Sequence, residues 1–508
     1  MIDQITGKSC APPASDRACT AAPVAADFDL FIIGTGGAGV AAAIQAAGMG
    51  AKVAIVEDST LGGTCVNVGC IPSKTLMEAA AHVHAAGRGF PGVAPCEPAV
   101  DWSEVVRQKD ALVRELRDAK YADVLASFPS VVRLNGRARL LSAVNGMVPG
   151  VVRIQVGEGE GAPVHTARKV VVASGATAAL PPIPGIEFID VLTSTTAMEL
   201  QKLPTSLIVL GGGQVGVELG QVFARFGVRV VIIQRGAQLL TGEDPEIAAV
   251  LREALEAEGI EVQTGTAAVR MEQVGAEAVV HVRRGTMAGQ VRAARVLVAV
   301  GRRPNTRDLG LEDIGIALTP SGHIQTDGTL RTTNPHVYAA GDVTGGPGFV
   351  YVAAAAGRVA AENALKALQG AGAVCDASQL DLSVVPSVTF TMPQVASVGL
   401  TEAAARASGL QVDVSVLDMA HVPRALASHD RRGLVKLVSE SGSGRVLGVQ
   451  AVASNAGEFM GEATLAVRLR LTVRDISATF HPYLTWGESL KLAAQGGSAG
   501  VEKLSCCA

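Results

Sequence analysis

The order of apolar and polar positions divides the chain into short strand-like runs and longer helix-like segments. Small side chains or helical periodicity mark the helix-like segments 40–49, 101–127, 217–226 and 352–368. Apolar runs typical of buried strands lie at 27–33, 52–56, 206–210, 228–233, 293–300 and 337–340. Because strands and helices alternate over much of this length, the pattern predicts an α/β fold.

Two further groups of strands stand apart from this alternation. Segments 131–140, 151–156 and 164–173 are expected to form the strands of a small sheet. After residue 380, strands are expected at 384–391, 412–418, 434–438 and 446–453, and helices at 401–408, 457–470 and 488–494. Strands and helices mixed in this way, without a glycine-rich nucleotide turn, predict a C-terminal α+β domain.

The first strand leads into a glycine-rich turn with a nucleotide-binding pattern. Gly34, Gly36 and Gly39 have the G-x-G-x-x-G spacing between a strand and a helix. Glycines at these positions let the backbone approach a pyrophosphate at the positive end of the helix dipole. The next strand ends in Glu57, which is placed to accept hydrogen bonds from ribose hydroxyls. Together these features predict a dinucleotide site.

The same pattern occurs a second time. The turn after the strand at 206–210 carries Gly211, Gly213 and Gly216. The following strand ends in Gln234 and Arg235 rather than in an acidic residue. An acid there would favour NAD, whereas a cation favours the additional 2′-phosphate of NADP. Two nucleotide folds in one chain imply two different nucleotides or a hydride relay between them.

Composition and charge exclude several classes of partner. The chain has 508 residues, of which 48% are hydrophobic, so about three domains with substantial cores are expected. Its net charge of -4 gives no reason to expect nucleic acid or an anionic membrane as a partner. No apolar stretch is long enough for a transmembrane helix, and residues 1–26 lack the apolar region of a secretory signal. The expected location is the cytoplasm.

Eight cysteines are sparse for this length, and two close pairs carry the candidate chemistry. Cys65 and Cys70 stand five positions apart in the sequence GGTCVNVGCIPSK. On an unbent helix five residues rise about 7.5 Å, which exceeds the roughly 4.4–6.8 Å between the Cα atoms of a disulfide. The pair can be a disulfide, a dithiol or a metal site, and a disulfide requires a distorted turn or a helix start. Cys10 and Cys19 lie in the leader without a surrounding motif.

The second pair, Cys506 and Cys507, lies next to the C-terminus. Adjacent cysteines form a strained disulfide ring, but they are well placed to hold a soft, thiophilic ion. Thiolates select soft metals, and we extend that rule to Hg(II). No C-a-a-X pattern is present, so the pair does not indicate lipidation.

The motif GGTCVNVGCIPSK, the two glycine fingerprints and the sequence YAAGDVT together resemble the flavoprotein disulfide reductases. The likeness covers residues 27–508 in order. It implies FAD on the first fingerprint and NADPH on the second. By position it also implies that Asp342 contacts the ribityl chain, and that Gly63 and Thr64 belong to the FAD site. Two Rossmann-like dinucleotide-binding domains plus a C-terminal α+β dimerisation domain are the expected architecture.

The resemblance also implies roles at the cysteine motif. Cys70 would be the thiol on the flavin side and Cys65 the interchange thiol. Lys74 would lie near the flavin N5 edge, paired with Glu218. In isolation, Lys74 would be interpreted as an ordinary surface lysine and Glu218 as an ordinary helix glutamate.

The C-terminus distinguishes between members of this family. Disulfide reductases share a His-Pro-x-x-x-Glu element that supplies a general base, but His481 and Glu488 are seven positions apart here. The stretch PYLT and the terminal pair Cys506 and Cys507 instead resemble the branch of the family that reduces Hg(II). In that branch Tyr483 would lie beside the metal. Two positions depart from the branch, because Val191 stands where a second tyrosine is common and His481 where a non-basic residue is usual.

These observations predict an NADPH- and FAD-dependent enzyme that reduces a Hg(II) thiolate to elemental mercury and works as a homodimer. The metal ligands would be Cys65, Cys70, Cys506 and Cys507. The alternative is a disulfide reductase of the glutathione or dihydrolipoamide type. The expected domains are a flexible leader at 1–26, an FAD domain at 27–180 and 304–378, an NADPH domain at 181–303, and a dimerisation domain at 379–508 with the metal-binding tail.

Overall fold

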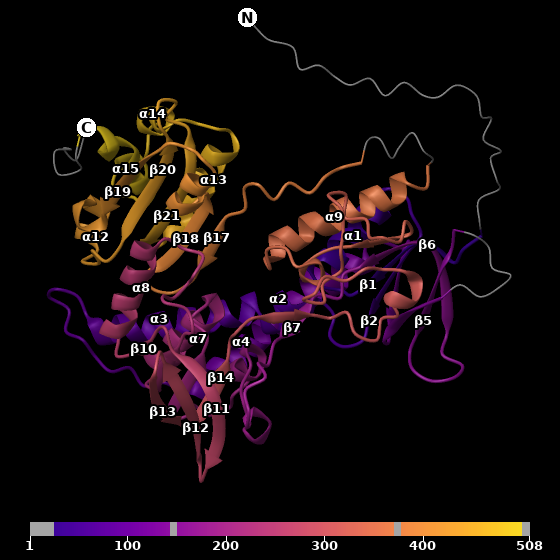
Figure 1. The fold of residues 1–508 in the computed structure, drawn as a ribbon, viewed down its shortest axis with the longest axis horizontal. Coiled ribbons are helices and arrows are strands. Elements are labelled where there is room, and N and C mark those ends of the chain that lie inside the picture. The colour runs from indigo at the N-terminus through magenta and orange to yellow at the C-terminus, as the bar shows by residue number, and fades with distance from the viewer. Residues whose placement is uncertain (1–24, 143–149, 370–376, 500–508) are drawn as a thin grey trace, which may run out of the picture.

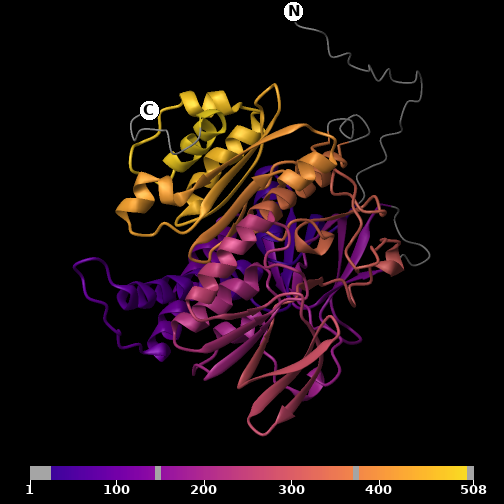
Figure 2. The ribbon, with the colours of Figure 1, turned by 60° about the vertical axis from the view of Figure 1, so that its left-hand side comes forward.

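The computed structural model describes residues 25–142, 150–369 and 377–499. Three sheet-based parts are visible, two with helices on mainly parallel sheets and one antiparallel C-terminal part (Figure 1). In Figure 2, turned by 60°, the C-terminal part again lies at one end, next to helix α8 (Pro245–Ala257). The fold class expected from the sequence is confirmed.

The first part is a seven-stranded sheet with the order β3-β2-β1-β6-β5-β4, and β16 pairs with β6. Its strands are β1 (Phe28–Ile33), β2 (Val53–Glu57), β3 (Val131–Asn135), β4 (Ala138–Leu141), β5 (Val152–Val156), β6 (Val164–Val172) and β16 (Val337–Ala339). Helices α1 (Gly37–Gly48) and α9 (Val350–Lys366) pack together beside it (Figure 1). A Cβ on Gly357 of α9 would lie 2.0 Å from the Ala38 oxygen, so this close packing requires glycine.

The expectation of a separate small sheet is wrong. β3 pairs in parallel with β2, and β6 pairs in parallel with β1, so both strands extend the first nucleotide sheet. The expected strand at 131–140 is also two strands, with Gly136 between them at a φ of +136°. Sequence patterns describe each strand but not its partners, because pairing depends on contacts far apart along the chain.

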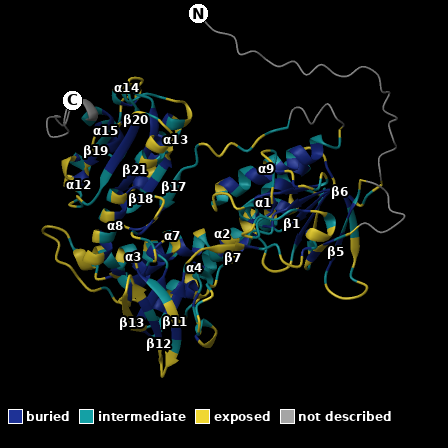
Figure 3. Ribbon diagram, viewed as in Figure 1, coloured by how far each residue is buried: buried dark blue, intermediate teal, exposed yellow. Residues whose placement is uncertain are grey.

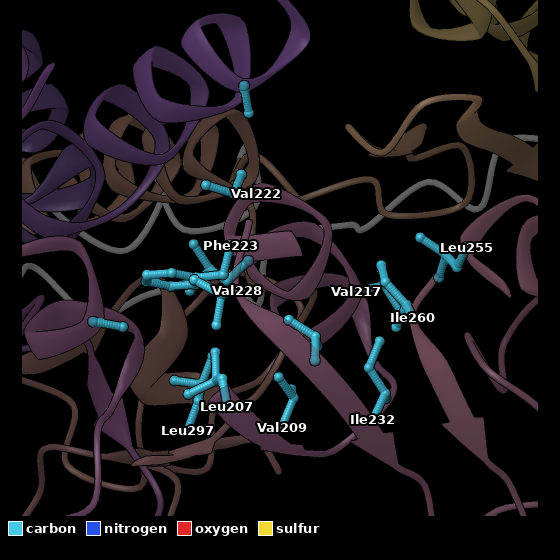
Figure 4. Packing of buried hydrophobic residues seen from close by; sticks show 14 of the residues in the cluster. Leu207, Val209, Val217, Val222, Phe223, Val228, Ile232, Leu255, Ile260 and Leu297 are labelled. Atoms are coloured by element: carbon cyan, nitrogen blue, oxygen red, sulfur yellow. The ribbon is translucent and has the colours of Figure 1, made fainter. Parts of the chain in front are cut away.

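The second part is a four-stranded parallel sheet with the order β10-β9-β8-β14. It comprises β8 (Ser206–Leu210), β9 (Arg229–Ile233), β10 (Glu261–Gln263) and β14 (Arg295–Val298), with helices α7 (Gln214–Arg225) and α8. An antiparallel sheet of β11 (Ala267–Val274), β12 (Glu277–Arg284) and β13 (Met287–Ala293) lies beside it. Figure 4 shows Phe223 of α7 among residues such as Leu207, Val228 and Leu297, all at most 5% exposed. Such burial is the main stabilising contribution to this domain.

Three helices connect the two nucleotide-type sheets. They are α2 (Gly63–Val68), α3 (Cys70–Arg88) and α4 (Trp102–Arg117), and α4 continues through a π-helical turn, Asp118–Ala122, into α5 (Asp123–Ala126). The helix expected at 101–127 is therefore present with an irregular segment. Short elements near them are β7 (Ala176–Ala178), α6 (Ser194–Met198) and β15 (Arg302–Pro304).

The C-terminal part is a five-stranded antiparallel sheet with the order β17-β18-β21-β20-β19. Its strands are β17 (Ser387–Thr389), β18 (Gln394–Gly399), β19 (Val412–Asp418), β20 (Leu434–Glu440) and β21 (Val446–Ala453). The helices are α11 (Glu402–Ala407), α12 (Pro423–Ala427), α13 (Ala456–Arg468), α14 (Val473–Ala478) and α15 (Glu488–Ala499). The sequence predicted most of these elements but missed β18, α12 and α14.

Burial follows the sheets. Most strands of the two nucleotide-type sheets are predominantly buried, as are β20 and β21, whereas β3 is largely exposed and the β11–β13 hairpins reach into solvent (Figure 3). Among the described helices none is both long and apolar enough to cross a membrane. The predicted domain boundaries at 180, 303 and 378 stay predictions.

Candidate active site

The turn between β1 and α1 has the shape of a phosphate cradle. Gly34 has a φ of +103°, and a Cβ there would lie 2.4 Å from the Ala173 oxygen. A Cβ on Gly39 would lie 1.8 Å from the Gly34 oxygen, so neither position tolerates a side chain. A Cβ on Gly63 would likewise lie 2.5 Å from Gly36 Cα, so the start of the cysteine motif packs directly against this turn. The backbone fits the pyrophosphate of a dinucleotide such as FAD.

Glu57 lies at the end of β2, next to the same turn. Its Oε2 accepts hydrogen bonds from the Thr35 amide at 3.1 Å and the Thr35 hydroxyl at 2.5 Å. Its Oε1 accepts from the amide of Ser59 at 3.2 Å and from its hydroxyl at 2.9 Å. The carboxylate is thereby fixed at the strand end where a nucleotide-binding acid is expected.

Asp342 follows β16 and faces a residue that the sequence analysis did not select. Arg302 of β15 places its Nε 3.6 Å from Asp342 Oδ2. Its Nη2 donates to the Thr64 hydroxyl at 3.3 Å, and it also donates to the Ala176 carbonyl. Arg302 therefore connects the two expected FAD residues Thr64 and Asp342. In the sequence, Arg302 is marked only by its position directly after Gly301, which ends the apolar run 293–300.

The two cysteines of the motif lie on different helices. Cys65 is on α2 and Cys70 begins α3, because Gly69 between them has φ and ψ of -131° and -110°, outside the helical region. The distorted turn expected from their spacing is present. Both cysteines are free thiols in this structure, with Cys65 partly buried and Cys70 exposed.

The environment separates the acidities of the two thiols. A hydrogen bond to Cys70, followed by burial, raises the pKa of Cys65. The same hydrogen bond lowers the pKa of Cys70 to about 7, against an opposing effect of burial and with help from the positive charge of Lys74. Near pH 7 about half of the Cys70 groups are therefore thiolates while Cys65 stays a thiol, which suits Cys70 as a nucleophile and metal ligand.

Lys74 and Glu218 make the contact expected from the sequence. The Lys74 Nζ lies 2.8 Å from Glu218 Oε2. The other oxygen of Glu218 accepts from the Phe390 amide at 2.8 Å, and the Lys74 ammonium lies 4.5 Å from the centre of the Phe390 ring. One carboxylate on α7 thus holds the lysine of the cysteine helix and a residue of the C-terminal part. Phe390 is a second residue that sequence reasoning missed.

The second fingerprint repeats the geometry of the first. Gly211 has a φ of +106°, and a Cβ on Gly216 would lie 1.9 Å from the Gly211 oxygen. A Cβ on Gly213 would meet no atom within 4 Å, so space is open above the start of α7. Gln234 Oε1 accepts from the Gly212 amide at 3.0 Å, as Glu57 accepts from Thr35 in the first turn. The geometry of this turn fits a pyridine nucleotide.

Arg235, the residue expected to select the nucleotide, is exposed beside this turn. It makes no ion pair or hydrogen bond with any other residue in the described part of the chain. Its guanidinium is therefore available to an anionic ligand such as a phosphate.

At the C-terminal end, the structure places Tyr483 at the surface, with 51% of its area exposed. His481 does not pair with Glu488 but lies 2.7 Å from Glu462 of α13. Val191, where a second tyrosine was considered, packs against an apolar cluster beside β8. Cys506 and Cys507 lie outside the described residues, as do Cys10 and Cys19. Within the described residues no group of three or more metal-ligating His, Cys, Asp or Glu side chains is assembled.

Comparison with known proteins agrees with this arrangement. Residues 28–357 match the family described as pyridine nucleotide-disulphide oxidoreductase, and residues 385–494 match its dimerisation domain. The chain belongs to the pyridine nucleotide-disulphide oxidoreductases, and it is accordingly an enzyme that uses flavin and a pyridine nucleotide. The dimerisation domain supports a homodimer.

Solved structures and curated relatives refine this placement. The flavoprotein disulfide reductase RclA of Escherichia coli, in its Cu(II) complex, has a TM-score of 0.80 and 30% identity, covering 92% of this chain and 99% of that one. LpdA of Mycobacterium tuberculosis has a TM-score of 0.80 at 28% identity, with the same shares of the two chains covered. Within the family the chain is similar to mercuric reductases. That of Streptomyces lividans is 44% identical over 95% of this chain and 98% of its own length, and that of Shigella flexneri is 44% identical over 94% and 82%.

Proposed function

We propose that this protein reduces Hg(II), presented as a bis-thiolate, to elemental mercury with electrons from NADPH. The observation that carries the proposal is the Cys65–Cys70 dithiol beside Lys74 and Glu218, in a chain whose relatives are named mercuric reductases. The balanced reaction consumes NADPH, one proton and the mercury bis-thiolate, and it yields NADP⁺, elemental mercury and two thiols. The two electrons that NADPH loses are the two that Hg(II) gains.

FAD fits along the β1–α1 turn, with Gly34, Gly36, Gly39 and Gly63 giving backbone access. Glu57 would accept from the ribose, and Thr64 and Asp342, joined by Arg302, would hold the middle of the cofactor. Bound there, FAD supplies two-electron transfer between the pyridine nucleotide and the dithiol. The proposed FAD domain comprises residues 27–180 and 304–378. The cytoplasmic location expected from the sequence stays a prediction.

The dithiol would take up the metal by ligand exchange. The family resemblance implies that Cys65 is the interchange thiol. We propose instead that Cys70, whose lowered pKa favours the thiolate, attacks the mercury of the bis-thiolate first, and that one thiolate leaves as a thiol after protonation. Cys65 then loses its proton and replaces the second thiolate, so the ion never enters water as a free ion. Lys74, held by Glu218, keeps a positive charge beside the Cys70 sulfur during this exchange.

Delivery to the dithiol would come from the partner subunit. In the proposed homodimer, the Cys506 and Cys507 pair of one chain binds Hg(II) and passes it to Cys65 and Cys70 of the other, beside Tyr483. The support for this step is the chemistry of adjacent thiolates at the chain end, together with the dimerisation domain.

NADPH would bind at the second fingerprint through Gly211, Gly213 and Gly216, with Arg235 on the 2′-phosphate. Replacing Arg235 with alanine is expected to raise the KM for NADPH about tenfold, the loss of one charge-assisted contact, and to leave the KM for NADH unchanged. Steady-state kinetics with both nucleotides measure this. An equal change for both nucleotides would contradict contact with the 2′-phosphate.

One assay separates the proposed function from the alternative, a disulfide reductase. Oxidation of NADPH by the purified flavoprotein is followed with Hg(II) in excess thiol, with oxidised glutathione and with lipoamide. Of these three substrates, only Hg(II) in excess thiol is expected to support rapid NADPH oxidation. Disulfide turnover without any mercury-dependent turnover would overturn the proposal.

The tail has a prediction of its own. Cys506→Ala combined with Cys507→Ala is expected to lower turnover of the Hg(II) bis-thiolate at least tenfold, because soft-metal capture on the tail is lost. Reduction of the flavin and dithiol by NADPH, followed by absorbance in a stopped-flow experiment, should stay unchanged. Failure of that half-reaction in the double variant would show that the tail has a structural role instead.

A further inference from the structure

The turn that carries Tyr483 is fixed by side chains on either side of it. His481, which precedes the turn, has a side chain only 5% exposed, although neighbouring Phe480 is 98% exposed. His481 Nε2 lies 2.7 Å from Glu462 Oε1 on α13, and its Nδ1 lies 3.0 Å from the Thr479 carbonyl oxygen. A histidine that follows a fully exposed residue in a loop is buried here because two acceptors hold its ring.

These two contacts use both ring nitrogens of His481. A carbonyl oxygen can only accept, so Nδ1 carries a hydrogen and donates it to Thr479. Nε2 lies 2.7 Å from the Glu462 carboxylate, so the second ring nitrogen is also engaged. A general acid or base needs one nitrogen within reach of its substrate. Neither nitrogen of His481 is free for that purpose.

The other side of the turn is held by Glu488, at the start of α15. This carboxylate is 9% exposed and its Oε2 accepts from the Leu484 amide at 3.2 Å. Leu484 has a φ of +60°, a conformation that a leucine keeps only when its surroundings hold it. The Thr485 hydroxyl also donates to the Pro482 carbonyl at 2.8 Å. Glu488 therefore stabilises the turn and does not orient His481.

We propose that His481 is a positioning residue, held by Glu462, that fixes the turn presenting Tyr483, and that it takes no part in proton transfer to a substrate. This inference rests on the proposed function, since it assigns Tyr483 to the Hg(II) site. It also defines specificity. With both of its nitrogens engaged, His481 is not available to protonate the leaving thiol of an organic disulfide.

The test compares truncating and conservative substitutions in the flavoprotein dimer. His481→Ala and Glu462→Ala remove the contact, whereas His481→Gln keeps an amide donor and Glu462→Gln keeps an acceptor. Glu458→Ala is the matched control, because Glu458 is an exposed carboxylate one turn earlier on α13 and has no side-chain partner among the described residues. Hydrogen exchange of the peptide covering residues 479–488 and steady-state kinetics with Hg(II) bis-thiolate and oxidised glutathione are measured for each.

Both alanine variants are expected to speed exchange in this peptide about tenfold, because the turn loses its charge-assisted anchor. The KM for Hg(II) should rise about fivefold while kcat stays within twofold, since the dithiol itself is unchanged. The Gln variants should restore both quantities to within twofold of the original protein, and Glu458→Ala should change neither.

Two results would overturn the inference. Unchanged exchange in the alanine variants would show that Glu462 does not fix the turn. Loss of turnover in His481→Gln as severe as in His481→Ala, with intact exchange, would show that the imidazole acts in proton transfer. If the unsubstituted protein fails to reduce Hg(II), the proposed function fails, while the exchange measurements still decide whether His481 positions the turn.

Discussion

Replacing Lys436 with methionine is expected to lower the free energy of unfolding by about 3–5 kcal/mol, because it leaves the buried carboxylate of Asp244 without its cation. The Lys436 side chain is 2% exposed on β20. Its Nζ lies 2.8 Å from Asp244 Oδ2 and 2.8 Å from Glu402 Oε2, and it also contacts the Glu246 carboxylate. Asp244 is itself 4% exposed, so its charge has little water to replace the lost ammonium.

The Lys436 cluster also joins two parts of the fold. Asp244 and Glu246 stand at the start of α8, in the second nucleotide-type part, while Lys436 and Glu402 belong to the C-terminal part. Figure 1 shows α8 reaching the end of the C-terminal sheet. Loss of the cation should therefore loosen this junction as well as lower stability.

Urea unfolding of the flavoprotein at pH 7 measures the effect. Lys366→Met is the control, because Lys366 forms a partly exposed ion pair with Glu362 one turn earlier on α9, and its loss should cost less than about 1 kcal/mol. Equal losses in the two variants would contradict the special role of the buried cation.

The difference in unfolding free energy between the original protein and Lys436→Met depends on pH with a defined sign. Burial acts to lower the pKa of Lys436, but hydrogen bonds to Asp244, Glu246 and Glu402 outweigh it and raise the pKa. The stabilisation is therefore complete below about pH 10, the unfolded value, and is lost as pH rises through the folded pKa. Hydrogen bonds from Lys436 and Arg406 lower the pKa of Glu402, so its share is complete above about pH 4.3 and is lost in acid. The gap between Lys436→Met and the original protein should be flat from pH 6 to 9 and should narrow below pH 4.

The sequence predicted the parts of the site that are built from local pattern. A glycine fingerprint needs only a strand, a turn and a helix that are contiguous, so Gly34, Gly39, Gly211 and Gly216 could be located without a structure. The spacing of Cys65 and Cys70 required a distortion, and it occurs at Gly69. The fold class followed from the same local signals.

Contacts between distant segments could not be predicted in this way. Nothing local in the sequence indicates that Glu462, nineteen positions before His481, is its partner in place of Glu488. The same is true of Phe390 beside Lys74 and of the carboxylates around Lys436, which come from two separate helices, α8 and α11. Helix α8 was missed although Pro245 after Asp244 is a typical helix start.

Replacing Cys70 with serine is expected to lower Hg(II) turnover at least a thousandfold, the largest functional effect anticipated in the chain. The thiolate is both nucleophile and soft-metal ligand, and a serine hydroxyl is neither at neutral pH. Flavin reduction by NADPH should persist, since the second fingerprint and the β1–α1 turn are untouched. Stopped-flow absorbance for that half-reaction and steady-state mercury turnover measure the two quantities separately.

The reason for this dependence on Cys70 can be tested through its acidity. A hydrogen bond from Cys65 lowers the pKa of Cys70 to about 7, opposed by burial and assisted by Lys74. Alkylation of Cys70 by iodoacetamide in the reduced protein should therefore be half-maximal near pH 7 and fall as the pH decreases, because the thiol form does not react. Cys65→Ala should move this midpoint upward by about one unit or more, and Lys74→Met should move it in the same direction by less. Peptide mass spectrometry after timed alkylation gives the midpoints, and one that stays near pH 7 in Cys65→Ala would show that Cys65 does not set the reactivity of Cys70.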